Sequence, residues 1–167
     1  MSHARPGPLR RLGLTLFRWL PTGPSYRLVR LTTPTFSVGA IALIEHDGAL
    51  LALRQTHRRG VSLPGGLIER GERPEQAVAR EVLEETGLRI DPGDAFATVF
   101  EPKLRHIDVI FRVLCDREPD IRVASEATDH EWLPLDEWWD IDSATARILA
   151  AVRAARHTPG PGRVLRA

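Results

Sequence analysis

Three glutamates stand at a spacing that could hold a metal ion. Glu81, Glu84 and Glu85 occupy positions i, i+3 and i+4 of a helical pattern, so their side chains project from one side. On a solvated helix face such like-charge pairs cost only about 0.2–0.5 kcal/mol each, and an ordinary surface stripe explains them equally. In a cleft, two carboxylates about 5 Å apart repel by roughly 3 kcal/mol at an effective dielectric near 20, and a divalent cation such as Mg²⁺ would relieve that repulsion.

Two adjacent glycines precede the glutamates. Gly65 and Gly66 follow Leu63 and Pro64, and glycine lets a backbone turn tightly and approach a ligand closely. A glycine carbonyl can also serve as an oxygen ligand beside carboxylates. Paired glycines alone more often make a simple turn, so they indicate a ligand site only in combination with the glutamates.

Two apolar runs near the start of the main domain predict a β-hairpin. They are residues 36–44 and 50–55, with Asp47 and Gly48 between them, and an Asp-Gly pair between two such runs is typical of a hairpin. Further strands are expected at residues 96–100, 106–115 and 130–133, and a helical turn at residues 135–139. These elements must position the glutamates.

The glutamates lie on a helix predicted at residues 74–86. Pro74 suits its first turn and Gly87 suits its end. The arc expected to face a sheet consists of Val78, Ala79, Val82 and Leu83. A last helix is expected at residues 143–156, with Ile148, Leu149 and Val152 facing inward.

The predicted strand 106–115 alternates in polarity. One face carries Ile107, Val109, Phe111, Val113 and Cys115. The other face includes Asp108 and Arg112. Such alternation is typical of a half-buried strand with one face toward solvent.

The composition is that of one ordinary globular domain. The chain has 167 residues, of which 43% are hydrophobic and 27% charged, which suffices for a single hydrophobic core. Cys115 is the only cysteine, so an internal disulfide and a cysteine-rich zinc site are excluded, and we expect a cytoplasmic protein. The formal net charge of +1 gives no reason to expect nucleic acid as a partner.

Both ends of the chain differ from the middle. Residues 1–34 form a basic extension, and leucines and arginines at helical spacing predict an amphipathic helix within it, at residues 9–20. That segment is too short to span a bilayer, and packing on the domain or on a second subunit is a better interpretation than attachment to a membrane surface. Residues 35–157 form the main domain, and the proline- and glycine-rich tail at residues 158–167 is expected to be disordered.

The register from Gly66 to Leu88 is specific. Gly66 is followed after five residues by Glu72, and after seven more by the run Arg80-Glu81-Val82-Leu83-Glu84-Glu85-Thr86-Gly87-Leu88. This segment resembles the Nudix box, and it agrees at every fixed position of that family's pattern. A chance match at so many fixed positions is improbable.

The resemblance implies a fold, an activity and residue roles. The fold would be α/β, a Nudix-type α/β/α sandwich with a central mixed sheet. The activity would be hydrolysis of the pyrophosphate bond in a nucleoside diphosphate linked to another group, with Mg²⁺ or Mn²⁺ as cofactor. The implied metal ligands are Glu81, Glu84, Glu85, the Gly65 carbonyl and Glu126. The implied catalytic residues are Glu81 as a candidate general base and Arg80 with Glu72 as a pair that fixes the loop against the helix.

Contacts with the substrate are less constrained by the sequence. The candidates are Arg54, Gly66, Lys103 and Arg105, although ordinary solvent exposure is the better explanation for each of the three cations. ADP-ribose-like compounds and nucleoside triphosphates both stay open as substrates. The rival interpretation is a non-catalytic regulatory domain that binds nucleotide sugars, and the intact box argues against it. Many relatives are dimers, so a homodimer is a further expectation.

Overall fold

The computed structural model describes residues 21–155 and 163–166, and the chain divides into two units, Met1–Thr35 and Phe36–Ala167. In the first unit the described structure is a helix, α2 (Thr22–Thr32), which the sequence analysis did not predict. Pro24 falls in its first turn, where a missing N–H breaks no intrahelical hydrogen bond. The amphipathic helix predicted at residues 9–20 lies outside the described residues.

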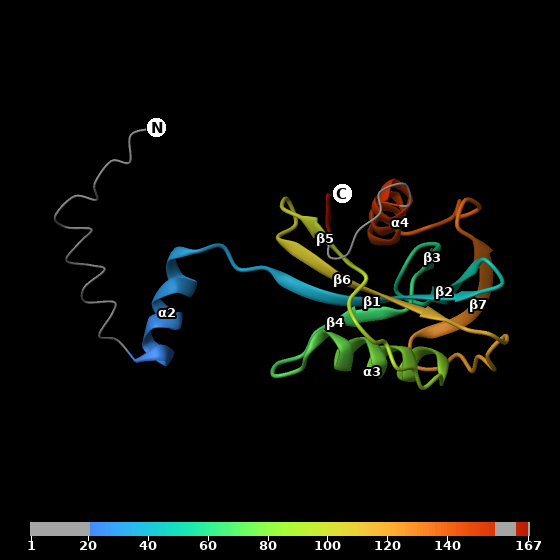
Figure 1. Ribbon diagram of the computed structural model, residues 1–167, viewed down its shortest axis with the longest axis horizontal. Helices are drawn as coiled ribbons and strands as arrows, with labels where there is room; N and C mark the ends of the chain where they lie inside the picture. The colour runs from blue at the N-terminus through green and yellow to red at the C-terminus, as the bar shows by residue number, and fades with distance from the viewer. Residues whose placement is uncertain (1–20, 156–162, 167) are drawn as a thin grey trace. The chain divides into compact units, whose positions relative to one another are not determined.

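The second unit contains one mixed sheet between two helices (Figure 1). Its strands are β1 (Ser37–His46), β2 (Ala49–Gln55), β3 (Val61–Ser62), β4 (Gly65–Leu67), β5 (Ala97–Glu101), β6 (His106–Leu114), β7 (Ala127–Pro134) and β8 (Arg163–Arg166). β1 pairs in parallel with β6 and antiparallel with β4, whereas β2 pairs antiparallel with β3 and β7. β1 and β2 pair with each other only beside their turn, so β4 can lie along the start of β1.

The predicted hairpin is confirmed. Asp47 has φ 47° and Gly48 has φ 77°, and a two-residue hairpin turn of type I′ needs positive φ at both central positions. The register pairs His46 with Ala49. The Asp-Gly pair therefore fixes where β1 ends and where β2 begins.

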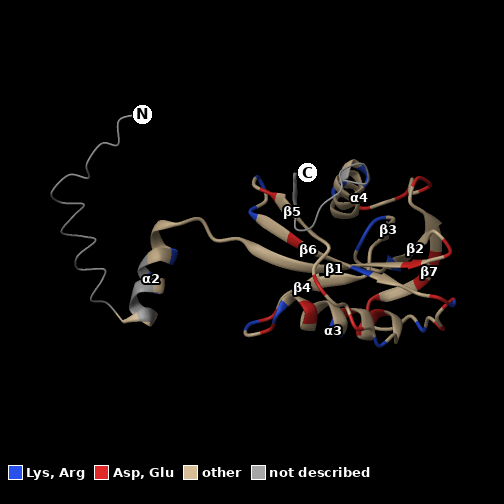
Figure 2. Cartoon of the chain, viewed as in Figure 1, with Lys and Arg blue, Asp and Glu red and all other residues tan. Residues whose placement is uncertain are grey.

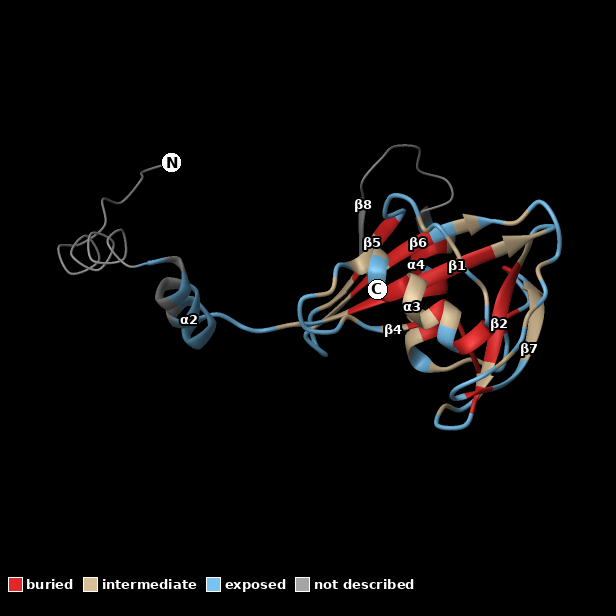
Figure 3. Cartoon of the chain, turned by 90° about the horizontal axis from the view of Figure 1, so that it is seen from below, coloured by how far each residue is buried: buried red, intermediate tan, exposed pale blue. Residues whose placement is uncertain are grey.

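Each face of the sheet is covered by one helix. α3 (Pro74–Thr86) covers one face and α4 (Ser143–Ala155) covers the other (Figures 1 and 3). Buried residues on the α3 side include Ala40, Ala42, Ile44, Leu51, Leu53, Val78, Val82 and Phe111. Those on the α4 side include Ile41, Leu43, Leu50, Val99, Ile110, Ile148, Leu149 and Val152. The alternation of β1 between the two clusters confirms the α/β/α sandwich with a central mixed sheet.

Both predicted helices are present, and α3 ends as expected. Gly87 adopts φ 72° and donates its N–H to the Leu83 carbonyl, which is the left-handed ending that glycine permits. Val78 and Val82 are buried on α3. None of the described helices is long and apolar enough to cross a membrane.

Three expectations need correction. The second face of β6 is solvated only toward its end, where Arg112 and Leu114 are exposed, whereas Asp108 and Ile110 are buried. Residues 135–139 contain a hydrogen-bonded turn, in which the Glu137 amide donates to the Pro134 carbonyl, and no helical turn. In the tail expected to be disordered, Arg163–Arg166 form β8, which pairs in parallel with β5. An exposed strand edge offers unpaired backbone groups that can bind such a segment.

Candidate active site

Glu85 is the most buried of the three glutamates. Its side chain lies in the last turn of α3, is only 6% exposed, and accepts hydrogen bonds from the Gly65 amide at 3.0 Å and from the Gln55 side chain. The pKa of Glu85 is raised to about 7, mainly by burial and also by the nearby negative charge of Glu81. The Gly65 amide, Arg58 and Gln55 act in the opposite direction, but they do not offset burial.

The two glycines bring backbone to the glutamates. Gly65 has φ 136°, a conformation that other residues rarely adopt, and any Cβ there would meet the Ala40 carbonyl. Hydrogen bonds from the amides on either side of this position place Gly65 opposite Ile41 at a non-hydrogen-bonded site of the β1–β4 ladder. Its N–H and C=O therefore point away from β1, and its N–H already contacts Glu85. A Cβ on Gly66 would overlap the Glu81 carboxylate.

Arg80 ties the loop before α3 to the helix. Its Nε and one Nη donate to the two Glu72 oxygens at 2.9 and 3.0 Å, and its other Nη donates to Glu81 at 2.8 Å and to Glu84 at 3.4 Å. The hydrogen bond from Arg80, joined by one from the Glu69 amide, lowers the pKa of Glu72. The contacts with Glu72 raise the pKa of Arg80. The guanidinium thus holds three acidic side chains from two segments.

The glutamates do not form a ready-made metal cage. Within the described residues, no three acidic, histidine or cysteine side chains are arranged to hold a metal ion. The carboxylates of Glu81 and Glu84 accept hydrogen bonds from Arg80, and that of Glu85 accepts hydrogen bonds from Gln55 and a backbone amide. The donor set nevertheless fits a hard cation, because Glu85 is a buried carboxylate with a raised pKa and its direct hydrogen-bond partners are neutral. Acidic residues along α3 and the adjoining loops are red in Figure 2.

Glu126 lies close to this site along the backbone. Its carbonyl accepts a hydrogen bond from the Thr56 amide at 3.1 Å, and the neighbouring Ala127 pairs with Gln55, whose side chain contacts Glu85. The Glu126 carboxylate is exposed and lies 2.8 Å from His57. It would have to leave that partner to join the glutamates of α3.

The predicted substrate-binding cations lie elsewhere on the fold. Arg54 neighbours Gln55 on β2, so its side chain points to the opposite face, where it contacts Glu131 at 3.2 Å and Asp140 at 3.4 Å. Lys103 and Arg105 are exposed in the turn between β5 and β6. Gly66 is the predicted residue that the structure places against both the glutamates and a cavity.

Two residues that the sequence analysis did not select contribute to the site. Gln55 contacts Glu85 directly. The positive charge of Arg58 lowers the pKa of Glu85, and Arg58 also donates a hydrogen bond to Asp142 at 2.8 Å. Asp142 also accepts from the Thr145 amide at 2.7 Å, which caps α4. The sequence could not show that Arg58 contacts Asp142, because the two residues are 84 positions apart.

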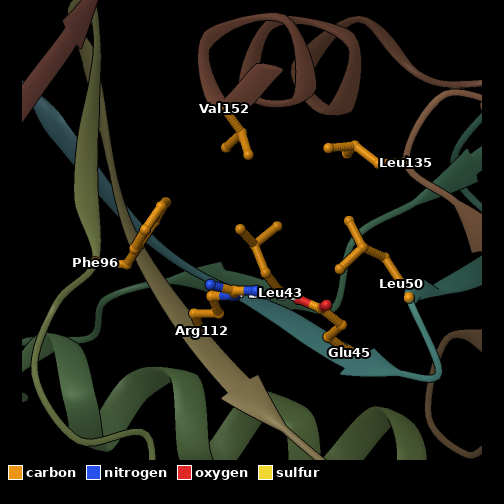
Figure 4. A pocket seen from close by; sticks show the side chains of 8 residues that line it. Leu43, Glu45, Leu50, Phe96, Arg112, Leu135 and Val152 are labelled. Carbon is orange, nitrogen blue, oxygen red and sulfur yellow. Dashed lines mark hydrogen bonds and ion pairs between the residues drawn. The ribbon is translucent and has the colours of Figure 1, made fainter. Parts of the chain in front are cut away.

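Two cavities lie under α4. The first, of about 90 Å³, is lined by Gly66, Arg58, His106 and Asp108 among others, and it adjoins the box. The second, of about 110 Å³, lies at the other end of β1 (Figure 4). It is surrounded mainly by Leu43, Leu50, Phe96, Leu135 and Val152, with the Glu45–Arg112 ion pair at one wall. No glutamate of the box lines either cavity, but Gly66 of the box lines the first.

A loop and a helix that gather glutamates beside two glycines, on one face of an α/β/α sandwich, are the arrangement that the resemblance implied for a hydrolase of phosphoric anhydrides. A family model described as the NUDIX domain matches residues 33–153. The chain therefore belongs to the Nudix family, and it is a pyrophosphohydrolase, which confirms the resemblance seen in the box.

Relatives and solved structures agree with this assignment. A MutT-like protein of Streptomyces ambofaciens is 38% identical over 110 residues, which cover 64% of this chain and 70% of that protein. The nucleoside triphosphatase NudI of Salmonella schwarzengrund (strain CVM19633) is 31% identical over 127 residues, covering 65% of this chain and 90% of that protein. The crystal structure of a MutT protein from Methanosarcina mazei Go1 is 26% identical, with a TM-score of 0.61, and covers 75% of this chain and 97% of that one.

Proposed function

We propose that the protein hydrolyses a phosphoric anhydride bond of nucleoside triphosphates, with Mg²⁺ or Mn²⁺ bound at the glutamates of α3. The observation that carries the proposal is the Glu85 carboxylate, which is buried beside Glu81 and hydrogen-bonded to the Gly65 amide. An anionic substrate can approach such a site only when a cation offsets its charge. The likeness to the nucleoside triphosphatase NudI favours triphosphates over ADP-ribose-like compounds.

Each acidic residue would have a distinct role. Glu84, Glu85 and the Gly65 carbonyl would hold the cation, with Glu126 as a further ligand from its loop, and Glu81 would lie beside them as the proton acceptor. The cation would lower the pKa of the attacking water and offset the charge of the phosphates. Gln55 would orient Glu85, and Arg80 would hold Glu72 against the helix.

Hydrolysis itself requires one proton acceptor. The oxygen of water forms a bond to phosphorus, the anhydride P–O bond breaks, and the proton lost by water passes to a carboxylate. Glu81 is the proposed acceptor, because its carboxylate lies against the Gly66 backbone, which borders the cavity beside the box. Arg80 contacts Glu81 at 2.8 Å and would fix its orientation.

Positive charge for the phosphates can come from several residues. Arg58 is the best placed, because it lines the cavity beside Gly66 and its charge already acts on Glu85. Lys103 and Arg105 remain candidates from the turn that leads to His106. Arg54 would first have to leave its two acidic partners.

The experiment is phosphate release from nucleoside triphosphates, ADP-ribose and nucleotide sugars, with Mg²⁺ present or chelated. We expect metal-dependent turnover of triphosphates that falls at least about 100-fold in Glu85→Gln. Glu118→Gln, at an exposed loop position, is the matched control and should keep wild-type rates. Unchanged turnover in Glu85→Gln would overturn the proposed role of the glutamates. Nucleotide binding without any turnover would favour a non-catalytic nucleotide-binding domain instead.

A cytoplasmic location and a homodimer belong to the same proposal. The single cysteine, Cys115, is partly buried, as expected for a thiol that forms no disulfide. Fractionation of cells would test the location. Sedimentation of the full chain would test the dimer.

A further inference from the structure

The cavity beside the box contains a buried acidic residue that the proposed chemistry does not use. Asp108 is only 6% exposed, and it lies on β6 at the wall of the 90 Å³ cavity that Gly39, Gly66 and Arg58 also line. Gly39, its partner in the β1–β6 register, makes room for it: a Cβ on Gly39 would lie 2.5 Å from the Asp108 carboxylate. A buried acid in a cavity needs a hydrogen-bonding partner.

A short relay of side chains orients Asp108. His106 Nε2 lies 2.8 Å from Asp108 Oδ1, and His106 Nδ1 lies 2.7 Å from Ser37 Oγ. A carboxylate only accepts hydrogen bonds, so His106 Nε2 carries the hydrogen in this contact. Within the described residues this is the only side-chain contact to Asp108, which leaves Oδ2 available to a ligand.

The cavity adjoins the glutamates at Gly66. Gly66 lines it, and the position of a Cβ on Gly66 is taken by the Glu81 carboxylate. Arg58 lines the cavity and acts electrostatically on Glu85. Gly66 therefore borders both the Glu81 carboxylate and the cavity that Asp108 lines, so a substrate whose phosphates lie at the glutamates would have Asp108 in the adjoining cavity.

The cavity is too small for a whole nucleoside. A closed apolar cavity of about 150 Å³ holds benzene, and this one has about 90 Å³. Only the edge of a nucleobase would enter it. At that edge an acceptor such as Asp108 Oδ2 favours an amino group and disfavours a carbonyl, because two acceptors would face each other without a hydrogen.

We propose that Asp108, oriented by Ser37 and His106, accepts a hydrogen bond from an exocyclic amino group of the nucleobase and so determines specificity. The enzyme would prefer cytosine, adenine or guanine nucleotides to their amino-lacking counterparts, uracil and hypoxanthine. This inference rests on the proposed function, since it assumes that the substrate is a nucleotide. It concerns base selection alone, and the chemical step is left to the glutamates.

The test is kcat/KM for CTP against UTP and for ATP and GTP against ITP, in wild type and in Asp108→Asn. We expect wild type to prefer an amino-bearing base over its counterpart by about tenfold or more. In Asp108→Asn the amide can still accept from His106 with its oxygen while it presents N–H to the base, so the preference should vanish or reverse. Asp94→Asn, at an exposed loop position, should keep the wild-type preference. An unchanged ratio in Asp108→Asn would overturn the inference.

A purely structural role of Asp108 would give a different result. Loss of fold lowers kcat/KM for all substrates together. Loss of base recognition changes the ratio of kcat/KM between amino-bearing nucleotides and their counterparts. His106→Gln, which keeps an N–H donor, should retain more of the preference than His106→Phe. Equal preferences in these two variants would contradict the relay.

Binding measurements separate this inference from the proposed function. Calorimetry with CMP, UMP, AMP and IMP needs no turnover. If wild type hydrolyses no triphosphate but Asp108→Asn reverses the preference among monophosphates, the proposed function fails and the inference stands. If triphosphates are hydrolysed and neither kinetics nor binding depends on Asp108, the proposed function stands and the inference fails.

Discussion

The two faces of the sheet collect their polar groups in different ways. On the α3 face, Gly65, Arg80 and Glu85 come from one continuous stretch, and Gln55 is the main addition from outside it. On the α4 face, His106 meets Ser37 across 69 residues and Arg58 meets Asp142 across 84. Under the proposed function, a local motif would supply the groups for chemistry, while tertiary packing would assemble the groups proposed to recognise the rest of the substrate.

The two faces also differ in how buried acids are neutralised. Burial alone would raise the pKa of Asp142, but the Thr145 amide and Arg58 together outweigh it and lower that pKa. Glu85 has no guanidinium in direct contact among its hydrogen bonds, and its pKa is raised to about 7. We infer that Asp142 has a structural role, since Arg58 already offsets its charge. The charge of Glu85 would instead be offset by a bound cation.

The largest expected effect is opposite pH dependence at these two acids. Because the folded-state pKa of Glu85 is raised, its contribution to stability is lost as pH rises from 4.5 to about 7. Without metal, the free energy of unfolding should fall by up to about 3 kcal/mol over that range, and Glu85→Gln should remove this part of the decline. Urea unfolding with a chelator measures it, and Mg²⁺ should restore stability above neutral pH in wild type only. Identical pH profiles for wild type and Glu85→Gln would contradict the account.

The next largest effect, on kcat, is expected from adding a methyl group at the α3 face. A Cβ at residue 66 would displace the Glu81 carboxylate, and misplacing a catalytic group by about 1 Å can cost 100-fold. Gly66→Ala should therefore lower kcat about 100-fold while the melting temperature changes little. A Gly66→Ala enzyme with wild-type kcat would show that the position of Glu81 is not critical.

The matching change on the other face is Gly39→Ala. Its Cβ would press on Asp108, 2.5 Å away, and should impair base recognition without moving Glu81. We expect kcat/KM to fall about tenfold for amino-bearing nucleotides, with kcat changed by less than about twofold. A large loss of kcat at saturating substrate would contradict the division of labour between the two faces.

The smallest effect is expected at Asp142. Its lowered pKa means that the Arg58–Asp142 pair stabilises the fold above the ordinary carboxyl pKa of 3.8, and that this stability is lost as pH falls through the folded-state value. Asn still caps a helix, so Asp142→Asn should cost only about 1 kcal/mol near neutral pH. The cost should vanish in acid. If Asp142→Asn still loses stability in acid, packing would explain the loss, and the ion pair would not.

Much of the catalytic side could be predicted from the sequence, because its signals are local. Helical spacing placed Glu81, Glu84 and Glu85 on one side of α3, and the Asp-Gly pair marked the hairpin. The pair of Arg80 with Glu72, implied by the resemblance, is present in the structure. The further contact of Arg80 with Glu81 was not predicted, because it depends on a side-chain conformation that spacing does not determine.

The α4 face could not be predicted in the same way. Asp108 and His106 stand at i and i+2 on a strand, so they share a face, but the alternation suggested that this face was solvated. Only the tertiary structure shows that Asp108 is buried and that Ile110 of the same face joins a core cluster with residues of α4. The β8 strand was missed because its pairing depends on the free edge of β5, far away in the sequence.

The measurement that tests the account most directly is Mn²⁺ binding by calorimetry to wild type, Glu85→Gln and Asp108→Asn. The account predicts that Glu85→Gln weakens binding at least about tenfold, while Asp108→Asn binds within about twofold of wild type. Equal affinity in wild type and Glu85→Gln would contradict a cation at α3. Equal losses in both variants would contradict the separation of chemistry and substrate recognition between the two faces.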